Sequence, residues 1–321
     1  MQADAIRRAT VVGAGLMGAD IAVVLSMASI AVTLVDICES QLELAQARMR
    51  ASMDSLVQCH LATQAQAEEA LRIVSGTTNR ATAVEHTEFV VESVPEDLSL
   101  KQEIFAALDA EAPPEAIWTS NTSSLSITAM AAATGRPERV VGSHFILPGT
   151  VLPLVEVVRG DQTNDDTMQT TYGLWQRAGK QPVMVQKDIP GFIHNRLQHA
   201  LSREAVSLWA SGVASAEEID AVVVNGFGLR LGRVGPLAQR DLGGMLMNVA
   251  IAAALYPSLS TLDDAPQAMK ELVAQGALGL ESGRGFHDWS GTDPQAKRRD
   301  VERALLADIL HRQRTLGDTD R

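Results

Sequence analysis

The feature that most constrains the fold is a glycine-rich turn at residues 13–18, with the sequence GAGLMG. It follows the β-branched pair Val11–Val12 and opens an apolar segment of helix length. Gly13 permits a tight turn, Gly15 lets a ligand approach the backbone, and Gly18 lets the helix pack closely on the strand. A helix N-terminus also offers free N–H groups and the positive end of a dipole. The order of strand, glycine turn and helix therefore predicts a phosphate-binding site.

A carboxylate follows where the second strand should end. Asp36 stands 18 residues after Gly18, and a carboxylate at that place accepts hydrogen bonds from an adenosine ribose and repels a 2′-phosphate. We therefore predict a dinucleotide site for NAD rather than NADP, with Leu16 and Met17 completing the turn that binds it. The alternative is a helix-capping aspartate after an ordinary glycine turn.

Short apolar runs alternate with helix-length segments from Ala9 to about Lys187, and strands largely disappear after that point. Several runs are continuously apolar, as strands covered on both faces of a parallel sheet must be. One of the expected strands is Leu71–Val74. We predict an α/β fold, a Rossmann-type doubly wound and mainly parallel sheet over residues 1–187, followed by an all-α domain over residues 188–321.

The junction between the two predicted domains carries a helix-start signal. Asp188 can accept from the free N–H groups of a first turn, and Pro190 lacks the N–H that would need a partner there. We therefore expect a helix to begin at Pro190 and to hold Asn195 in its second turn. Asn195 then shares a polar stripe that is either part of a site or a solvated face, formed with Gln198, His199 and Ser202.

Composition excludes several classes of function. The 39 acidic and 27 basic side chains give a net charge of −12, and the scattered basic residues argue against nucleic-acid binding. The apolar stretch at 21–35 is shorter than the roughly 20 residues that cross a bilayer, and the start lacks a signal-peptide pattern. Cys38 and Cys59 lack the spacing of metal ligands or of a disulfide framework. We expect a cytoplasmic protein with a small-molecule substrate and no nucleic-acid, membrane or metal partner.

Among the seven histidines, His144 alone is expected at the end of a strand near other distinctive polar residues. Open α/β sheets bind their ligands at the carboxyl ends of strands. Glu156 lies within the apolar run 154–158, where a carboxylate needs a partner, and a turn rich in proline and glycine could bring it to His144. Such a carboxylate fixes the imidazole tautomer, as a general base requires. The alternatives are a structural histidine and an outward-facing glutamate.

A run of small polar residues at 120–124 (SNTSS) follows the expected strand Ile117–Thr119. These side chains suit hydrogen bonding to a ligand at the sheet edge, which makes Asn121 and Ser123 candidate site residues. They suit a loop or a helix cap equally well. Residue types alone leave both uses open.

Taken together, the motifs resemble the L-3-hydroxyacyl-CoA dehydrogenase family from about residue 7 to Trp289. The resemblance is carried by the glycine turn with Asp36 and by the segments at 120–125, 142–145, 154–158, 187–197 and 283–286. It implies an NAD-dependent dehydrogenase of fatty acid metabolism that oxidises a 3-hydroxyl to a 3-keto group, in 3-hydroxybutyryl-CoA or a similar substrate.

The resemblance also implies residue roles. His144 is the catalytic base paired with Glu156, and Ser123 and Asn195 contact the reacting oxygen and hold the substrate. Positions that contact the cofactor in the family are matched by Glu96 and Lys101. The helical domain is similar to one through which these enzymes dimerise, so we expect a homodimer.

The sequence departs from the family pattern at three places, and the last of them favours a second substrate class. Leu147 stands where CoA-dependent members often have asparagine, and Glu281 stands where a cofactor-contacting lysine is usual. Residues 51–69 contain no Lys or Arg, where CoA-binding members carry a lysine cluster. CoA phosphates need basic partners. The alternative substrate is a free hydroxy acid, as in the carnitine, gulonate and pyridine-alcohol dehydrogenases, with Arg230 binding its carboxylate.

Two further alternatives are more distant. The glycine turn is shared with the 6-phosphogluconate and hydroxyisobutyrate group, which uses a lysine in a glycine-rich helix as its acid and base; here the counterpart is only Gly179-Lys180 entering a strand. Leu147 and Glu281 in place of ligand contacts would also fit a noncatalytic dinucleotide-binding protein of the crystallin type.

Overall fold

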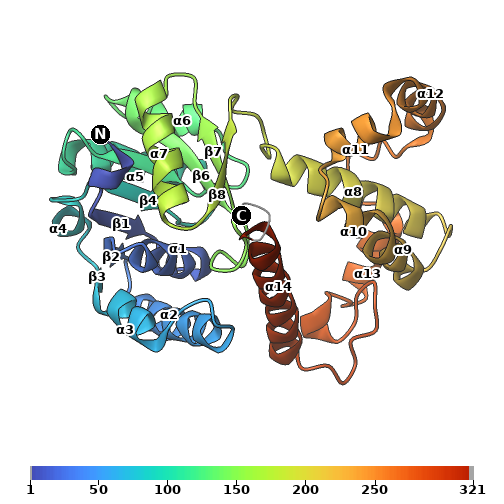
Figure 1. Cartoon of the computed structure of the whole chain (residues 1–321), viewed down its shortest axis with the longest axis horizontal. Helices are drawn as coiled ribbons and strands as arrows, with labels where there is room; N and C mark the ends of the chain where they lie inside the picture. The colour runs from blue at the N-terminus through green and yellow to red at the C-terminus, as the bar shows by residue number, and fades with distance from the viewer. Residues whose placement is uncertain (1, 318–321) are drawn as a thin grey trace. The chain divides into compact units, whose positions relative to one another are not determined.

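The computed structural model describes residues 2–317, with side chains described as far as His311. Contacts divide the chain into two units (Figure 1). The first contains the residues up to Asn195 and those from Asp300 onward, and the second is Arg196–Arg299. The sequence places the boundary at residues 187 and 188, and it assigns the end of the chain to the second domain.

An eight-stranded sheet forms the centre of the first unit, in the order β3-β2-β1-β4-β5-β6-β7-β8. All neighbouring strands are parallel except β6 and β7, which are antiparallel. The predicted doubly wound, mainly parallel sheet is therefore confirmed. The strands are β1 (Arg8–Val12), β2 (Ala31–Val35), β3 (Val74–Thr77), β4 (Phe89–Glu92), β5 (Ile117–Ser120), β6 (Val140–Phe145), β7 (Leu154–Arg159) and β8 (Gln181–Val185).

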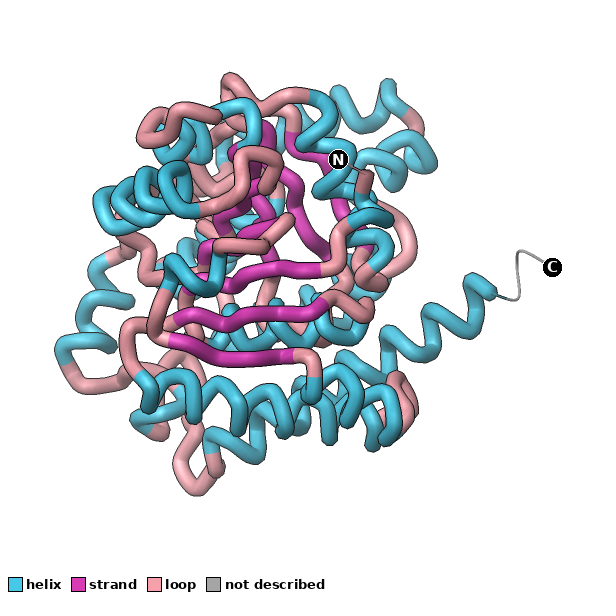
Figure 2. Tube along the Cα trace, turned by 90° about the vertical axis from the view of Figure 1, so that its left-hand side faces the viewer, coloured by secondary structure: helices cyan, strands magenta, loops and turns pink. Residues whose placement is uncertain are grey.

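Helices cover both faces of this sheet, as the strands and helices of Figure 2 show. Side chains alternate between faces along each strand, so Val11 joins one buried cluster and Val12 the other. One face is covered by α1 (Leu16–Met27), α2 (Glu39–Gln58), α3 (Gln64–Arg72) and α7 (Asp165–Arg177). The other is covered by α4 (Arg80–Val84), α5 (Leu98–Glu111) and α6 (Ile127–Ala131).

The expected strand Leu71–Val74 is wrong in its first three residues. Helix α3 begins with a reciprocal cap in which Gln66 N donates to Thr63 Oγ1 and Thr63 N donates to Gln66 Oε1. The capped helix continues through Arg72, so it takes Leu71, and β3 begins only at Val74.

The helix expected to begin at Pro190 begins instead at His194, as α8 (His194–Ala210). Gly191 and Phe192 have positive φ angles of 76° and 49°, which no right-handed helix can contain. Asp188 caps a different helix, because its Oδ2 accepts from the N–H of Thr128 at 2.8 Å in the first turn of α6. Asn195 consequently lies in the first turn of α8.

The second unit is helical, as predicted; among residues 196–299 the only β pairings are isolated bridges. Next to α8 in sequence is α9 (Ala216–Val222), which passes into a π-helical turn at Val223–Phe227 with a kink at Gly226. The remaining α-helices are α10 (Gly228–Leu231), α11 (Pro236–Gly243), α12 (Met245–Leu255) and α13 (Gln267–Ala274).

The last helix, α14 (Pro294–Gly317), belongs to the first unit from Asp300 onward. Leu306 is buried in the same apolar cluster as α1 and α2, and Leu305 and Ile309 pack against that cluster. These apolar side chains explain why the end of the chain does not join the second unit.

No helix in the described part of the chain is long and apolar enough to cross a membrane. Among the side chains that the structure describes, up to His311, no three metal-ligating groups are placed so that they could hold a metal ion.

Candidate active site

His144 and Glu156 face each other across the antiparallel pair β6–β7, in direct register. The Nδ1 atom of His144 lies 2.7 Å from Oε2 of Glu156. Both residues are buried, with 3% and 1% of their surface exposed. The turn between the two strands therefore joins them as the sequence predicted.

Glu156 is held as a carboxylate by further donors. Its Oε1 accepts from the backbone N–H groups of Ile193 and His194, each at 2.9 Å. Burial alone would raise the pKa of Glu156, but the hydrogen bonds from His144 and from the His194 backbone hold that pKa below its ordinary value. Because an ionised carboxylate only accepts, Nδ1 of His144 carries the hydrogen and Nε2 is left to take a proton.

The polar run at 120–124 is ordered by Glu96, which lies between β4 and α5. Its Oε1 accepts from Thr122 Oγ1 at 2.6 Å and from the N–H groups of Ser123 and Ser124 at 2.9 and 3.1 Å. Burial opposes the charge, yet the hydrogen bond from Thr122 and the nearby Lys101 ammonium keep the pKa of Glu96 lowered. Glu96 thus fixes the loop that contains Ser123.

Hydrogen bonds connect the loop at 120–124 to Asn195 and to the strand that contains His144. Asn195 Nδ2 donates to the backbone oxygen of Ser123 at 2.9 Å. Asn121 Oδ1 accepts from the N–H of Phe145, the residue after His144, at 2.9 Å. The predicted residues at 120–124 and 195 therefore meet at the carboxyl ends of β5 and β6.

Lys101 lies beneath this loop and is only 1% exposed. Its Nζ donates to Glu92 Oε1 at 2.7 Å and to the oxygen of Val94 at 3.2 Å, and it lies 3.4 Å from Glu96 Oε2. Lys101 thus supports Glu96 from below the loop.

Glu92 is a residue that the sequence reasoning missed. It is fully buried at the end of β4, and its Oε2 accepts from Ser120 Oγ at 2.5 Å. The signal was present in the sequence, because Glu92 ends the apolar run Phe89–Val91 and a carboxylate in an apolar strand needs a partner, as for Glu156.

The glycine turn has the geometry that a phosphate cradle needs. Gly13 has a φ of 105°, and a Cβ there would lie 2.5 Å from the oxygen of Ser93. A Cβ on Gly18 would lie 1.8 Å from the oxygen of Gly13. A Cβ on Gly15 would meet nothing within 4 Å, and Gly15 caps α1 without any side-chain hydrogen bond. The space beside Gly15 is therefore open, and no side chain caps the first N–H groups of α1.

Asp36 stands beside this turn, since its Oδ2 accepts from the N–H of Ala14 at 2.8 Å. The next residue, Ile37, is 99% exposed.

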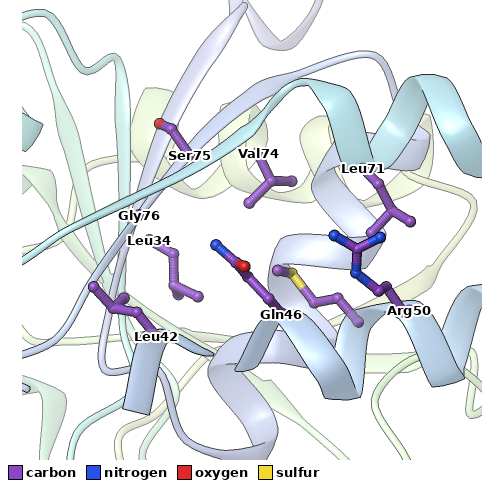
Figure 3. A pocket seen from close by; sticks show the side chains of 9 residues that line it. Leu34, Leu42, Gln46, Arg50, Leu71, Val74, Ser75 and Gly76 are labelled. Carbon is purple, nitrogen blue, oxygen red and sulfur yellow. The ribbon is translucent and has the colours of Figure 1, made fainter. Parts of the chain in front are cut away.

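A small pocket of about 150 Å³ opens at the β3 edge of the sheet, between α2, α3 and β3 (Figure 3). Arg50 is the one charged residue in its lining, and the following segment, 51–69, brings no cation into α2 or α3. Arg72, at the end of α3, is already paired with Glu69 at 2.6 Å. The pocket is lined by Leu34, Leu42, Gln46, Met49, Arg50, Leu71, Val74, Ser75 and Gly76.

The departures Leu147 and Glu281, and the expected carboxylate partner Arg230, have distinct surroundings. Leu147, in the turn after His144, is 52% exposed. In the second unit, Glu281 pairs with Arg298 at 2.6 Å, and Arg230 lies exposed in the last turn of α10.

Comparisons with known proteins agree over both units. Residues 8–189 match the family model for the NAD binding domain of 3-hydroxyacyl-CoA dehydrogenase, and residues 191–289 match that for its C-terminal domain. A 5-formyl-3-hydroxy-2-methylpyridine 4-carboxylate 5-dehydrogenase of Mesorhizobium japonicum is 31% identical, over 94% of this chain and 97% of the relative. A probable 3-hydroxybutyryl-CoA dehydrogenase of Bacillus subtilis is 35% identical, over 88% of this chain and 98% of the relative.

Solved structures show the same two kinds of relative. A crystal structure of the pyridine carboxylate dehydrogenase, described as an NAD+ dependent dismutase, has a TM-score of 0.87 at 30% identity and covers 95% of this chain and 97% of its own. The (S)-3-hydroxybutyryl-CoA dehydrogenase of Ralstonia eutropha has a TM-score of 0.73 at 35% identity and covers 89% of this chain and 100% of its own.

Proposed function

Since the chain belongs to the 3-hydroxyacyl-CoA dehydrogenase family and is an NAD-dependent dehydrogenase acting on a hydroxyl group, we propose that it oxidises a 3-hydroxyl to a 3-keto group with His144 as general base. The observation that carries this proposal is the buried contact of 2.7 Å between His144 Nδ1 and Glu156 Oε2. A carboxylate that is itself fixed by two backbone N–H groups orients the imidazole and stabilises its charged form.

The glycine turn fits the phosphates of NAD, because the space beside Gly15 is open and the N–H groups of α1 lack a side-chain cap. Gly13, Gly15 and Gly18 would hold the pyrophosphate through the backbone, together with Leu16 and Met17. Asp36 would accept from the adenosine ribose, and Ile37 offers an apolar surface to the adenine.

We assign the remaining proposed cofactor contacts to the loop at 120–124. Asn121 lies next to the strand of His144, and Glu96 holds the loop in place. Lys101 acts through Glu96, since its ammonium group is buried against Glu92 and Glu96.

Bound NAD supplies the hydride acceptor, while the residues of this chain hold the substrate and move its proton. Nε2 of His144 takes the hydroxyl proton, and Glu156 stabilises the imidazolium that results. Asn195 uses one amide hydrogen on the oxygen of Ser123, so its second N–H and the Ser123 hydroxyl are the proposed donors to the developing carbonyl oxygen.

The family makes a 3-hydroxyacyl thioester such as 3-hydroxybutyryl-CoA the first candidate substrate. A free hydroxy acid is the second, and specific observations favour it. The segment at 51–69 contributes no cation for CoA phosphates. Leu147 presents an apolar side chain where CoA-dependent members often have the amide of an asparagine. The structural match is also closer to a dehydrogenase named for a pyridine carboxylate than to the 3-hydroxybutyryl-CoA enzyme. Arg230 is the proposed partner of the free carboxylate.

A substrate panel tests the proposal. NADH formation should be measured with 3-hydroxybutyryl-CoA and with free 3-hydroxy acids and hydroxylated aromatic carboxylates. Activity on the thioester alone would remove the case for the free acid. Binding of NADH by calorimetry with turnover of no panel member would favour the noncatalytic alternative.

We also propose that the protein is a homodimer assembled through its helical unit. Large apolar side chains on α11 and α12 are exposed in the single chain, with Leu246 at 91% and Leu237 and Met247 well exposed. A second copy of the same surface would cover them. Light scattering coupled to size exclusion measures the mass; a monomer at micromolar concentration would contradict the proposal.

A cytoplasmic location is proposed from the two free cysteines, Cys38 and Cys59, which suit a reducing compartment.

A further inference from the structure

Two buried charges from distant segments meet on the turn that connects β6 to β7. Asp20 in α1 accepts from the N–H of Gly149, with its Oδ2 2.7 Å from the nitrogen. Lys180, immediately before β8, donates through Nζ to the oxygen of the same Gly149 at 2.6 Å and to that of Leu152 at 3.0 Å. Both side chains are at least nine-tenths buried.

The close approach of Asp20 leaves no room for a side chain at Gly149. A Cβ at that position would lie 2.9 Å from the Cβ of Asp20 and 3.3 Å from Cε of Met17, so a larger residue would push the turn away from α1. The Lys180 ammonium also lies 5.9 Å from the ring centre of Phe145, the residue after His144. The turn is therefore held against α1 on one side and against the start of β8 on the other.

Asp20 and Lys180 thereby connect the two segments whose relative position matters for hydride transfer. Helix α1 begins at the glycine turn that fits the cofactor phosphates, and the turn at 146–153 connects the strand of His144 to the strand of Glu156. Displacements of about 1 Å at such a site cost on the order of 10²-fold in rate.

We propose that Asp20 and Lys180 are positioning residues, a buried clamp on Gly149 that fixes the His144–Glu156 hairpin relative to the cofactor-binding helix α1. The proposal rests on the proposed role of His144 for its effect on catalysis. Its effect on the turn itself is independent of that role.

The charged groups that face Asp20 are Lys180 and, from α14, Glu302. Burial raises the pKa of Asp20 to about 6, against the hydrogen bond from Gly149 and the attraction of Lys180. Burial lowers the pKa of Lys180 to about 8, against the attraction of Asp20. Both groups are therefore charged at neutral pH, and acid below about pH 6 neutralises the Asp20 arm of the clamp.

The kinetic test compares Lys180→Met and Lys180→Arg in the full-length protein, with Arg72→Met as the matched control from an exposed ion pair in the same unit. K180M keeps the apolar stem and loses the ammonium group with both of its hydrogen bonds. It should lower kcat by about 10–100-fold while the KM for NAD changes less than about threefold, and K180R should recover part of the loss. A folded K180M with the kcat of the R72M control would overturn the proposal.

Hydrogen exchange of the peptide that covers residues 147–152 tests the clamp without any substrate. In the wild type, exchange corrected for its intrinsic pH dependence should slow as the pH falls from 7.5 to 5, because a carboxyl whose pKa is raised by burial favours the closed turn when it is protonated. In Asp20→Asn this pH dependence should disappear. Exchange that does not depend on pH in the wild type, or the same pH dependence in D20N, would overturn the proposal even if K180M did not fold. If no panel substrate is turned over, the proposed function fails and the exchange result alone decides the clamp.

Discussion

Glu156 receives a hydrogen bond from His144 on one oxygen and from the backbone N–H groups of Ile193 and His194 on the other. The carboxylate therefore joins the β6–β7 strand pair to the segment that leads into α8. A single side chain sets both the imidazole tautomer and the path of the backbone that delivers Asn195.

Replacing the base tests its role directly. His144→Gln should lower turnover by about 10²–10⁴-fold, because no group remains to take the hydroxyl proton. Binding of NADH, followed by calorimetry, should stay unchanged. The exposed His86 provides the control variant, His86→Gln, whose turnover should equal that of the wild type. Near-normal turnover in H144Q would contradict the assignment.

Replacing Glu156, the partner of His144, should change the free energy of unfolding by an amount that depends on pH. The pKa of Glu156 is lowered in the folded protein, so its ionised form stabilises the fold above the ordinary carboxyl range, and this contribution is lost as the pH falls through the lowered value. Glu156→Gln should therefore cost about 1.5–3 kcal/mol at pH 7, as for lost hydrogen bonds to a charged group, and the difference from the wild type should shrink in acid. Urea unfolding across pH measures it. A difference that grew in acid would show that Glu156 is not charged in the fold.

Removing only one member of the buried Lys101–Glu92 pair should lower the free energy of unfolding. Lys101→Met leaves the buried Glu92 without its counter-charge and should destabilise the protein by about 3–5 kcal/mol. Adding Glu92→Gln should recover part of that loss, since the uncompensated charge is then gone. Denaturant unfolding of both variants, with the exposed Lys270→Met as control, measures the coupling. Strictly additive losses would argue against the pair.

Arg230 distinguishes the two candidate substrates. Arg230→Met should raise the KM for a free hydroxy acid by roughly 10–100-fold, as expected for loss of hydrogen bonds to a charged group worth about 1.5–3 kcal/mol. The KM for a CoA thioester should not change. Arg233→Met, three residues further on, is the matched control. An equal effect of both variants on the free acid would assign Arg230 no specific role.

Local patterns made much of the fold and site predictable. The glycine turn and Asp36 act through backbone geometry that a few adjacent residues dictate. His144 and Glu156 were predictable because a carboxylate in an apolar strand needs a partner and a short turn left one within reach.

Other features depended on contacts between segments far apart in the sequence. Asp20 in the apolar helix α1 gave no hint of Gly149, which lies 129 residues further on. The sequence suggested that Asp188 caps the helix that follows it. The positive φ angles of Gly191 and Phe192 delay that helix, and Asp188 instead accepts a hydrogen bond from the first turn of α6. The charged surface of α14 likewise concealed Leu306, which is buried in the first unit with Leu305 and Ile309 packed beside it.

The return of α14 to the first unit makes the helical segment an insertion into that unit rather than an appendage at its end. Dissection of the protein must respect this topology. A fragment ending at Trp289 would retain every residue matched by the family models, yet it would leave the surface beneath Leu305 and Leu306 bare to water. A stable nucleotide-binding fragment requires residues 300–317 to be spliced back onto residues 1–195.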